Sequence, residues 1–192
     1  MTDSDFENTL KGMRRYYPVS HASAKELFAY CTPLRLPKYH ILTRPEVRDN
    51  SIYFIEQGCT RTYLLIDGKE ITNWFSTEGD ITFSSNALYH RKPGFEYVQL
   101  LENSLLYALP IDILNNFYEN NMEIANWSRV IHQEVLLKMQ TLRLDQLSIT
   151  AKERYEKFLV ENPGLVNRVN LRFVASYLGM TQQYLSSIRA EV

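Results

Sequence analysis

The spacing of hydrophobic positions divides the chain into a central strand-rich region with helical regions on either side. Apolar residues at helical spacing in residues 5–17 and 23–31 predict two short helices. From residue 33 onward, short segments rich in β-branched and aromatic residues alternate with turn residues. These segments are YHILT, SIYFIEQ, CTRTYLLI, KEITNWFS, FEYVQLLE and SLLYALP. They predict an antiparallel roll, barrel or sandwich with a hairpin at Asp67-Gly68.

A long helical segment follows the strands. Residues 111–147 contain neither proline nor glycine, and their apolar residues return to helical spacing. One stripe runs through Ile124, Trp127, Ile131, Val135, Met139 and Leu142. A second set repeats every seven residues on another face, at Val130, Leu137 and Leu144. Because a helix with two apolar faces needs two partners, we expect one face to pack on the β-domain and the other on a second copy of the chain.

This pattern predicts a homodimer, and the alternative is a single helix buried within its own domain. The predicted interface residues are Trp127, Val130, Ile131, Leu137 and Leu144. Just beyond this helix, Thr150 and Glu153 have the spacing of a capping box, which predicts that a new helix begins there. The expected domains are therefore a β-roll sensor domain (1–120), a connecting and dimerisation helix (121–147) and a helix-turn-helix domain (148–192).

The C-terminal segment LRFVASYLGMTQQYLSSIRAEV has the spacing of a helix-turn-helix. The motif needs a small residue where its helices cross and a residue with positive φ at the turn, and Ala175 and Gly179 stand at those positions. The inward-facing positions are all apolar: Val174, Leu178, Met180, Leu185 and Ile188. Thr181 stands where its hydroxyl can cap the second helix. The alternative is a chance amphipathic helical hairpin.

The second helix of such a motif lies in the major groove of DNA, and its exposed residues touch base edges. The residues predicted to contact DNA are Thr181, Gln182, Gln183, Ser186, Ser187 and Arg189. Arg172 and Arg168 are placed for phosphate contacts, unless they are solvated charges. Glutamine can pair with adenine through two hydrogen bonds, whereas serine and threonine are permissive, so we expect modest discrimination between sequences.

Composition excludes several other classes of protein. The first twenty residues lack a signal-peptide core and no apolar run could span a bilayer, so we expect a cytoplasmic protein that does not contact membranes. Cys31 and Cys59 are too few for a disulfide framework or a four-thiolate cluster. The histidines form no His-x-His pair, which argues against a cupin-type metal enzyme. We expect no catalytic residues, no metal and no cofactor. The net charge of −1 does not by itself indicate a nucleic-acid-binding protein.

Taken together, these segments resemble the Crp/Fnr family of regulators, and in particular its short members from Bacteroidetes. IYFIEQGCTRTYLLIDGKEITNWFSTEGD is similar to the family's β-roll pattern, with Gly58 before a strand and a Gly79-Asp80 corner. VASYLGMTQQYLSSIR resembles its recognition module. The resemblance implies an α+β fold. Its parts would be an antiparallel β-roll like the cyclic-nucleotide-binding jelly roll with flanking helices, a long dimerisation helix and a C-terminal winged-helix or helix-turn-helix domain.

The chain departs from the nucleotide-binding members of this family in the segment that holds the cyclic phosphate. Those members carry a Gly-Glu pair and an Arg-Ser-Ala run, and both are absent here. The effector pocket implied by the resemblance consists of Phe83, Ser84, Ser85, Asn86, Arg91 and Phe95. We therefore expect no cAMP binding. The recognition helix departs too, because Ser187 replaces a common arginine, so the family's usual DNA half-site is not carried over.

The resemblance implies a homodimeric, sequence-specific transcription regulator. Its expected partners are double-stranded DNA with an inverted repeat, a second copy of the chain, RNA polymerase and an unidentified small-molecule effector. The alternative is a protein-interaction module, or a gas or small-molecule sensor on the same scaffold, with weak or no DNA binding.

Overall fold

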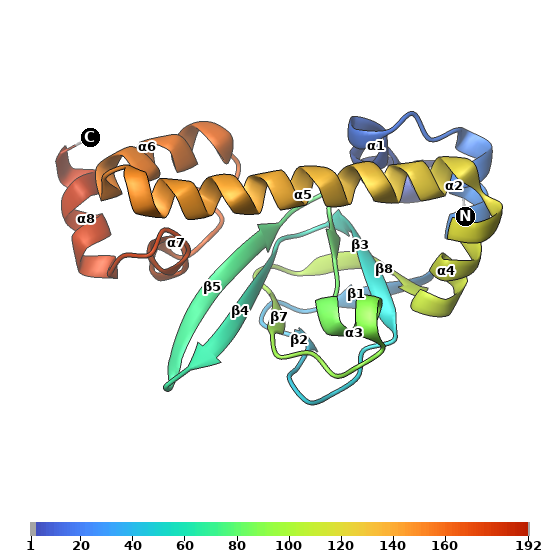
Figure 1. Cartoon of the computed structure of the whole chain (residues 1–192), viewed down its shortest axis with the longest axis horizontal. Helices are drawn as coiled ribbons and strands as arrows, with labels where there is room; N and C mark the ends of the chain where they lie inside the picture. Colours follow the sequence, from blue (N-terminus) through green and yellow to red (C-terminus); the bar gives the residue numbers. More distant parts are fainter. Residues whose placement is uncertain (1–2, 192) are drawn as a thin grey trace. The chain divides into compact units, whose positions relative to one another are not determined.

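Two four-stranded sheets form the strand-rich part of the computed structural model, which describes residues 3–191 (Figure 1). Their strand orders are β1-β8-β3-β6 and β2-β7-β4-β5. The strands are β1 (Thr32–Leu36), β2 (Ile41–Thr43), β3 (Ser51–Gln57), β4 (Thr60–Ile66), β5 (Lys69–Ser76), β6 (Ile81–Thr82), β7 (Tyr97–Leu100) and β8 (Ser104–Pro110). Strand β8 pairs antiparallel with both β1 and β3, and β7 pairs antiparallel with β2. The expected antiparallel β-roll with flanking helices is confirmed.

Helices precede and follow the strands, and one lies between β6 and β7. The N-terminal helices are η1 (Asp3–Phe6), α1 (Glu7–Tyr16) and α2 (His21–Phe28), and the helix among the strands is α3 (Ser85–His90). The helices after the strands are α4 (Ile111–Asn120), α5 (Met122–Ser148), α6 (Ala151–Glu161), α7 (Leu171–Tyr177) and α8 (Gln182–Glu191).

The helical segment 111–147 is not continuous, in contrast to the uninterrupted apolar spacing of its sequence. Helix α4 ends at Asn120, and Asn121 has an extended backbone with φ −131° and ψ 104°. The Asn121 side-chain oxygen accepts hydrogen bonds of 3.1 Å from the backbone N–H groups of Glu123 and Ile124. Asn121 therefore caps the start of α5, because the first amide groups of a helix have no partner within the helix.

Contacts divide the described residues into two units. The first unit contains residues 3–62 and 75–133, and the second contains residues 63–74 and 134–191. Helix α5 contributes residues to both units, and so does the β4–β5 hairpin.

The core of the first unit contains a series of aromatic side chains. The rings of Phe6 and Phe28 stack with centroids 4.4 Å apart, and Phe28 lies 5.2 Å from Phe54. Phe54 in turn stacks on Trp127 of α5 at 5.7 Å. All four side chains are at most 1% exposed. The N-terminal helices and the first turns of α5 are therefore packed into one core with strand β3.

Helix α1 is fixed to the roll by a buried carboxylate and by two glycines. The Glu56 carboxylate accepts hydrogen bonds of 3.0 Å from the backbone N–H groups of Asn8 and Thr9. It thereby satisfies amides at the start of α1. A Cβ atom on Gly12 would lie only 1.9 Å from the carbonyl oxygen of Gly79. Glycine at position 12 is therefore required for this close approach.

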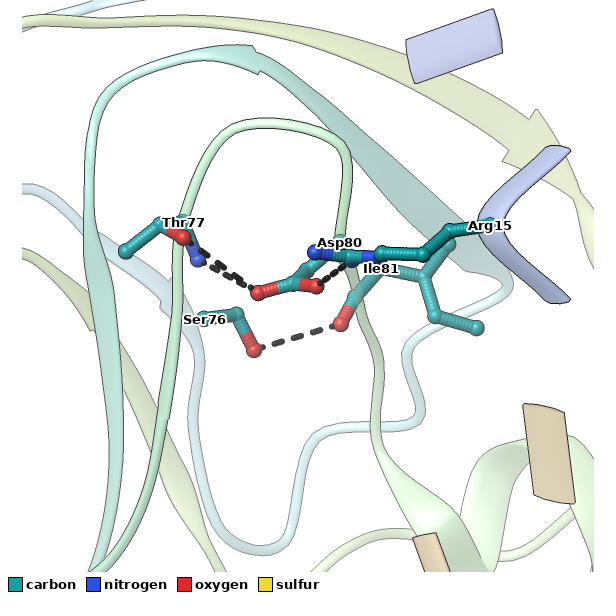
Figure 2. A network of polar contacts seen from close by, with 5 residues as sticks. All are labelled: Arg15, Ser76, Thr77, Asp80 and Ile81. Carbon is teal, nitrogen blue, oxygen red and sulfur yellow. Dashed lines mark hydrogen bonds and ion pairs between the residues drawn. The ribbon is translucent and has the colours of Figure 1, made fainter. Parts of the chain in front are cut away.

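The corner after β5 is held by the carboxylate of Asp80 (Figure 2). This carboxylate accepts a hydrogen bond of 2.9 Å from the backbone N–H of Thr77 and forms an ion pair of 2.6 Å with Arg15 of α1. The Ser76 hydroxyl donates to the carbonyl oxygen of Ile81 at 3.3 Å. These contacts fix the chain where it enters β6, directly before the predicted effector segment.

The capping box predicted at the start of α6 is confirmed. The Thr150 hydroxyl accepts from the backbone N–H of Glu153 at 3.3 Å, and the Glu153 carboxylate accepts from the backbone N–H of Thr150 at 2.8 Å. The hydrogen bonds from Thr150 lower the pKa of Glu153. Lys157 of α6 forms an ion pair of 2.5 Å with Asp145 of α5, which joins the two helices within the second unit.

Candidate nucleic-acid interface and effector segment

Helices α7 and α8 form the helix-turn-helix that the sequence predicts. Ala175, at the expected helix crossing, is 1% exposed, and Gly179 has φ +71° at the turn. Leu185 and Ile188 of α8 are 0% and 4% exposed. The backbone N–H of Tyr184 donates to the Thr181 hydroxyl at 3.2 Å, so Thr181 caps α8 as predicted. Residues 162–170, between α6 and α7, contain turns and no strand.

The residues predicted to contact DNA on the second helix are exposed, with Thr181 at its start and the others within α8. Thr181, Gln182, Gln183, Ser186, Ser187 and Arg189 are all exposed. At 100° per residue, Gln183 points opposite to the buried pair Leu185 and Ile188, and Ser186 and Ser187 lie beside it. Gln182 and Arg189 lie on one flank of this face. The arrangement offers hydrogen-bonding side chains without a large aliphatic group at the centre, which suits contact with base edges.

Tyr184 lies on the other flank of the same face and was not among the residues predicted from the sequence. Its side chain is 55% exposed, although tyrosine can bury a large apolar ring. The angular position of Tyr184 relative to Leu185 and Ile188 could have identified it from the sequence, because at 100° per residue it lies at the boundary between the buried and exposed sides of the helix. We call the surface of Gln183, Ser186 and Ser187 the recognition face of α8. Tyr184 and Arg189 border it on opposite sides.

The two candidate phosphate contacts differ in exposure. Arg172 of α7 is exposed, and its guanidinium carbon lies 4.6 Å from the ring centre of Phe173. This contact with a buried ring restricts the side chain while its donors remain available. Arg168, in the turn before α7, is half-buried. Arg172 is the better placed of the two to meet a phosphate group.

Two of the residues predicted at the dimer interface lie on the face of α5 that packs on the β-roll. Trp127 and Ile131 are 1% and 5% exposed within a single chain, and Trp127 packs on Phe54. They belong to the stripe of α5 that faces the β-roll, so they are not available to a second copy. The physical reason is that spacing along one helix identifies an apolar face without identifying its partner.

The opposite face of α5 carries exposed leucines. Leu137 and Leu144, both predicted at the interface, are 56% and 62% exposed. Leu136 and Leu147 are 58% and 77% exposed and lie on the same side of the helix, although the seven-residue spacing did not select them. Val130, at the N-terminal end of this face, is half-buried. We call Leu136, Leu137, Leu144 and Leu147 the leucine face of α5.

The predicted effector residues do not share one environment. Ser84 is fully buried, whereas Ser85 is exposed and Phe95 is 60% exposed. Asn86 donates a hydrogen bond to the carbonyl oxygen of Pro93 at 3.1 Å, which closes the loop that follows α3. Arg91 forms an ion pair of 3.0 Å with Asp112 of α4, so its charge already has a partner.

The carboxylate of Glu96, which is not among the residues predicted from the sequence, occupies the start of α3. Glu96 is 4% exposed, and its two oxygens accept hydrogen bonds from the backbone N–H groups of Ser85 at 2.8 Å and Phe95 at 3.0 Å. The amide of Ser85 lies within the predicted effector segment. A negative charge from the chain itself therefore lies where the resemblance would have an anionic ligand.

Aromatic rings connect this segment with α5. Phe83 and Tyr89 are in edge contact at 6.1 Å, and both lie within 6.2 Å of the His132 ring. The His132 Nδ1 atom lies 2.6 Å from the carbonyl oxygen of Ser128. Burial raises the pKa of Tyr89 to about 12. The cluster joins Phe83 and α3 to the first unit's part of α5.

Comparison with known proteins agrees with this architecture. Residues 33–121 match the family model of the cyclic nucleotide-binding domain. No curated protein matches the sequence.

Several solved structures share the fold across most of the chain. FixK2 from Bradyrhizobium japonicum has a TM-score of 0.74 at 18% identity, with 84% of this chain and 83% of that chain covered. The c-di-GMP responsive global regulator CLP from Xanthomonas campestris has a TM-score of 0.75 at 12% identity, with 90% and 91% covered. A protein from Eubacterium rectale described as a transcriptional regulator of the Crp/Fnr family has a TM-score of 0.70 at 16% identity, with 92% and 87% covered.

The chain therefore shares the fold of these structures, with a cyclic-nucleotide-binding-like β-roll, a long helix and a C-terminal helix-turn-helix. The expectation from the sequence is confirmed at this level. No helix in residues 3–191 is long and apolar enough to cross a membrane.

Proposed function

We propose that this protein is a homodimeric, sequence-specific DNA-binding transcription regulator. The observation that carries the proposal is the exposed surface of Thr181 and α8, where six polar residues lie on a well-packed helix-turn-helix. Hydrogen-bonding side chains on a rigid helix that fits the major groove are what direct readout of bases requires. Gln183 at the centre reads a base, while Arg172, Tyr184 and Arg189 contact the DNA backbone.

The leucine face of α5 supports a dimer. Four exposed leucines on one side of a helix leave an apolar patch that water solvates poorly, and a second copy of the same helix would cover it. A two-fold pair of such helices would present two recognition helices to successive major grooves. In this proposal residues 1–120 form the sensor, 121–147 join the protomers and 148–192 bind DNA in contact with RNA polymerase.

The effector segment supports a regulator that does not respond to cAMP. A cyclic phosphate at the start of α3 would meet the buried Glu96 carboxylate instead of a guanidinium. A buried like charge makes anion binding unfavourable, and the phosphate would lose its hydration without gaining a paired charge. Any effector of this protein is therefore not recognised through a phosphate at this segment.

The experiment that tests the function is selection of bound duplexes from a random DNA pool by the full-length protein. We expect enrichment of an inverted repeat whose half-sites lie about one helical turn apart, centre to centre. An enriched single site without a repeat would retain DNA binding and contradict the dimer. No enrichment over the input pool would contradict the regulator and favour the alternative of a protein-interaction or small-molecule-sensing module.

A further inference from the structure

The last strand of the second sheet has an open edge. In the order β2-β7-β4-β5, strand β5 pairs with β4 on one side, and among residues 3–191 no strand pairs with its other side. An edge of this kind presents a row of N–H and C=O groups that can bind another segment. Residues 63–74, which form most of the β4–β5 hairpin, belong to the same unit as the helix-turn-helix.

One side chain of the helix-turn-helix binds this edge. The Ser176 hydroxyl of α7 accepts a hydrogen bond of 2.9 Å from the backbone N–H of Thr72 and donates one of 3.1 Å to the carbonyl oxygen of Glu70. In a strand, the C=O of one residue and the N–H of the residue two positions later point to the same side. A single hydroxyl therefore takes the place of a neighbouring strand at this point.

The contact uses the face of α7 that also carries a proposed DNA contact. Ser176 follows Arg172 by four residues, so the two side chains lie one above the other on the same face of the helix. Arg172 is the candidate for contact with a phosphate group. The hairpin thus contacts the side of α7 that the DNA backbone would approach in the proposed complex.

We propose that Ser176 and the edge of β5 form a latch that restrains the helix-turn-helix in the DNA-free protein and opens when the protein binds its DNA site. This regulatory role rests on the proposed function, whereas the contact itself does not. The latch is autoinhibitory, because a helix-turn-helix held on the hairpin must give up two hydrogen bonds before α7 meets the DNA backbone.

The two hydrogen bonds between Ser176 and β5 are weak enough to break reversibly when DNA binds. A neutral hydrogen bond contributes about a two- to tenfold change in an equilibrium constant after solvent exchange. Two such bonds can be replaced by the charge-assisted contacts that phosphates provide. At the other end of the hairpin segment, the Lys138 ammonium of α5 lies 5.2 Å from the ring centre of Trp74. The hairpin thus contacts two helices of the second unit.

Hydrogen exchange in the full-length protein without DNA tests the contact directly. The Thr72 amide should exchange slowly in the wild type, because Ser176 accepts its hydrogen bond, and faster by about two- to tenfold in Ser176→Ala. Ser176→Thr retains a hydroxyl and should restore slow exchange, whereas the exchange of amides in β3 should be the same in all three proteins. Equal exchange of the Thr72 amide in wild type and Ser176→Ala would overturn the latch.

DNA binding tests the inhibitory role. With a duplex enriched by selection, Ser176→Ala should bind more tightly than wild type. The gain in affinity should be at most about tens of fold, which is the product of the fold-changes from two hydrogen bonds. Ser176→Thr should bind like wild type. The Thr72 amide of the wild type should exchange faster in the DNA complex than in the free protein. Weaker binding by Ser176→Ala, or stronger protection of Thr72 in the complex, would overturn autoinhibition. If the wild type selects no duplex, the proposed function fails, while the exchange result without DNA still decides whether the contact forms.

Discussion

Phe54 of strand β3 and Trp127 of helix α5 stack with their ring centroids 5.7 Å apart and 27° between their planes. Both side chains are almost completely buried. This pair fixes the first turns of α5 to the roll and shows which of the two apolar faces of the helix packs within the chain. The face with Trp127 stabilises the single chain, and the leucine face remains for a partner.

Replacing Trp127 with alanine should therefore destabilise the fold without abolishing dimerisation. Truncation of a buried tryptophan leaves a cavity and removes its transfer free energy, at a cost of about 3 to 5 kcal/mol. Urea unfolding monitored by circular dichroism measures this loss. Light scattering of the folded fraction should still give a dimer. A stable monomeric variant would return Trp127 to the interface.

Placing a charge on the leucine face should produce a monomer. Leu137→Glu or Leu144→Glu would bury an unpaired carboxylate between two helices, which is strongly unfavourable. The matched control is Val160→Glu on α6, because Val160 is 81% exposed and lies outside the leucine face. Sedimentation at low micromolar concentration should show monomers for the two leucine variants and a dimer for the control. A dimer in all three proteins would exclude the leucine face as the interface.

The protein should not bind cAMP. The reason is the buried carboxylate of Glu96 at the amide of Ser85, together with the ion pair that engages Arg91. A calorimetric titration of the wild-type protein with cAMP should show no binding heat above dilution. Micromolar affinity would contradict this prediction, and loss of that affinity in Arg91→Ala or Lys92→Ala would identify the replacement cation.

Substitutions on α8 and α7 should separate base contacts from backbone contacts. Gln183→Ala should relax preference at one base pair in each half-site by about 1 to 3 kcal/mol, and Gln182→Ala should do so more weakly because Gln182 lies on the flank. Arg172→Ala and Tyr184→Phe should weaken binding to all sequences alike. Fluorescence anisotropy over a set of single-base variants distinguishes the two patterns. Uniform weakening by Gln183→Ala would remove Gln183 from base readout.

Much of the fold could be predicted because its signals are local. The segments SIYFIEQ, KEITNWFS and SLLYALP coincide with β3, β5 and β8 residue by residue. The helix-turn-helix could be predicted from the small residue at position 175, the glycine at position 179 and the apolar positions between them. These features depend on burial and backbone conformation within one short segment.

The rest depends on contacts between distant segments. Strand β6 has two residues, too few for a periodic pattern, and β1 is an edge strand that contains Pro33. Helix α3 begins at Ser85, whose amide donates a hydrogen bond to the carboxylate of Glu96, eleven residues later. The assignment of Trp127 to the wrong face of α5 has the same origin, because only the folded β-roll shows which stripe it covers.

Half-site spacing decides whether the protein reads DNA as a two-fold dimer, because binding to an inverted repeat depends on the dimer and the recognition helices together. The enriched inverted repeat is compared with a duplex of the same half-sites separated by about five additional base pairs, half a helical turn. The extra half-turn places the second half-site on the opposite side of the DNA. Anisotropy titrations should show that wild-type protein loses most of its specific affinity for the altered duplex, down to that of a single half-site. Equal affinity for both duplexes would contradict a two-fold dimer that reads DNA with two α8 helices.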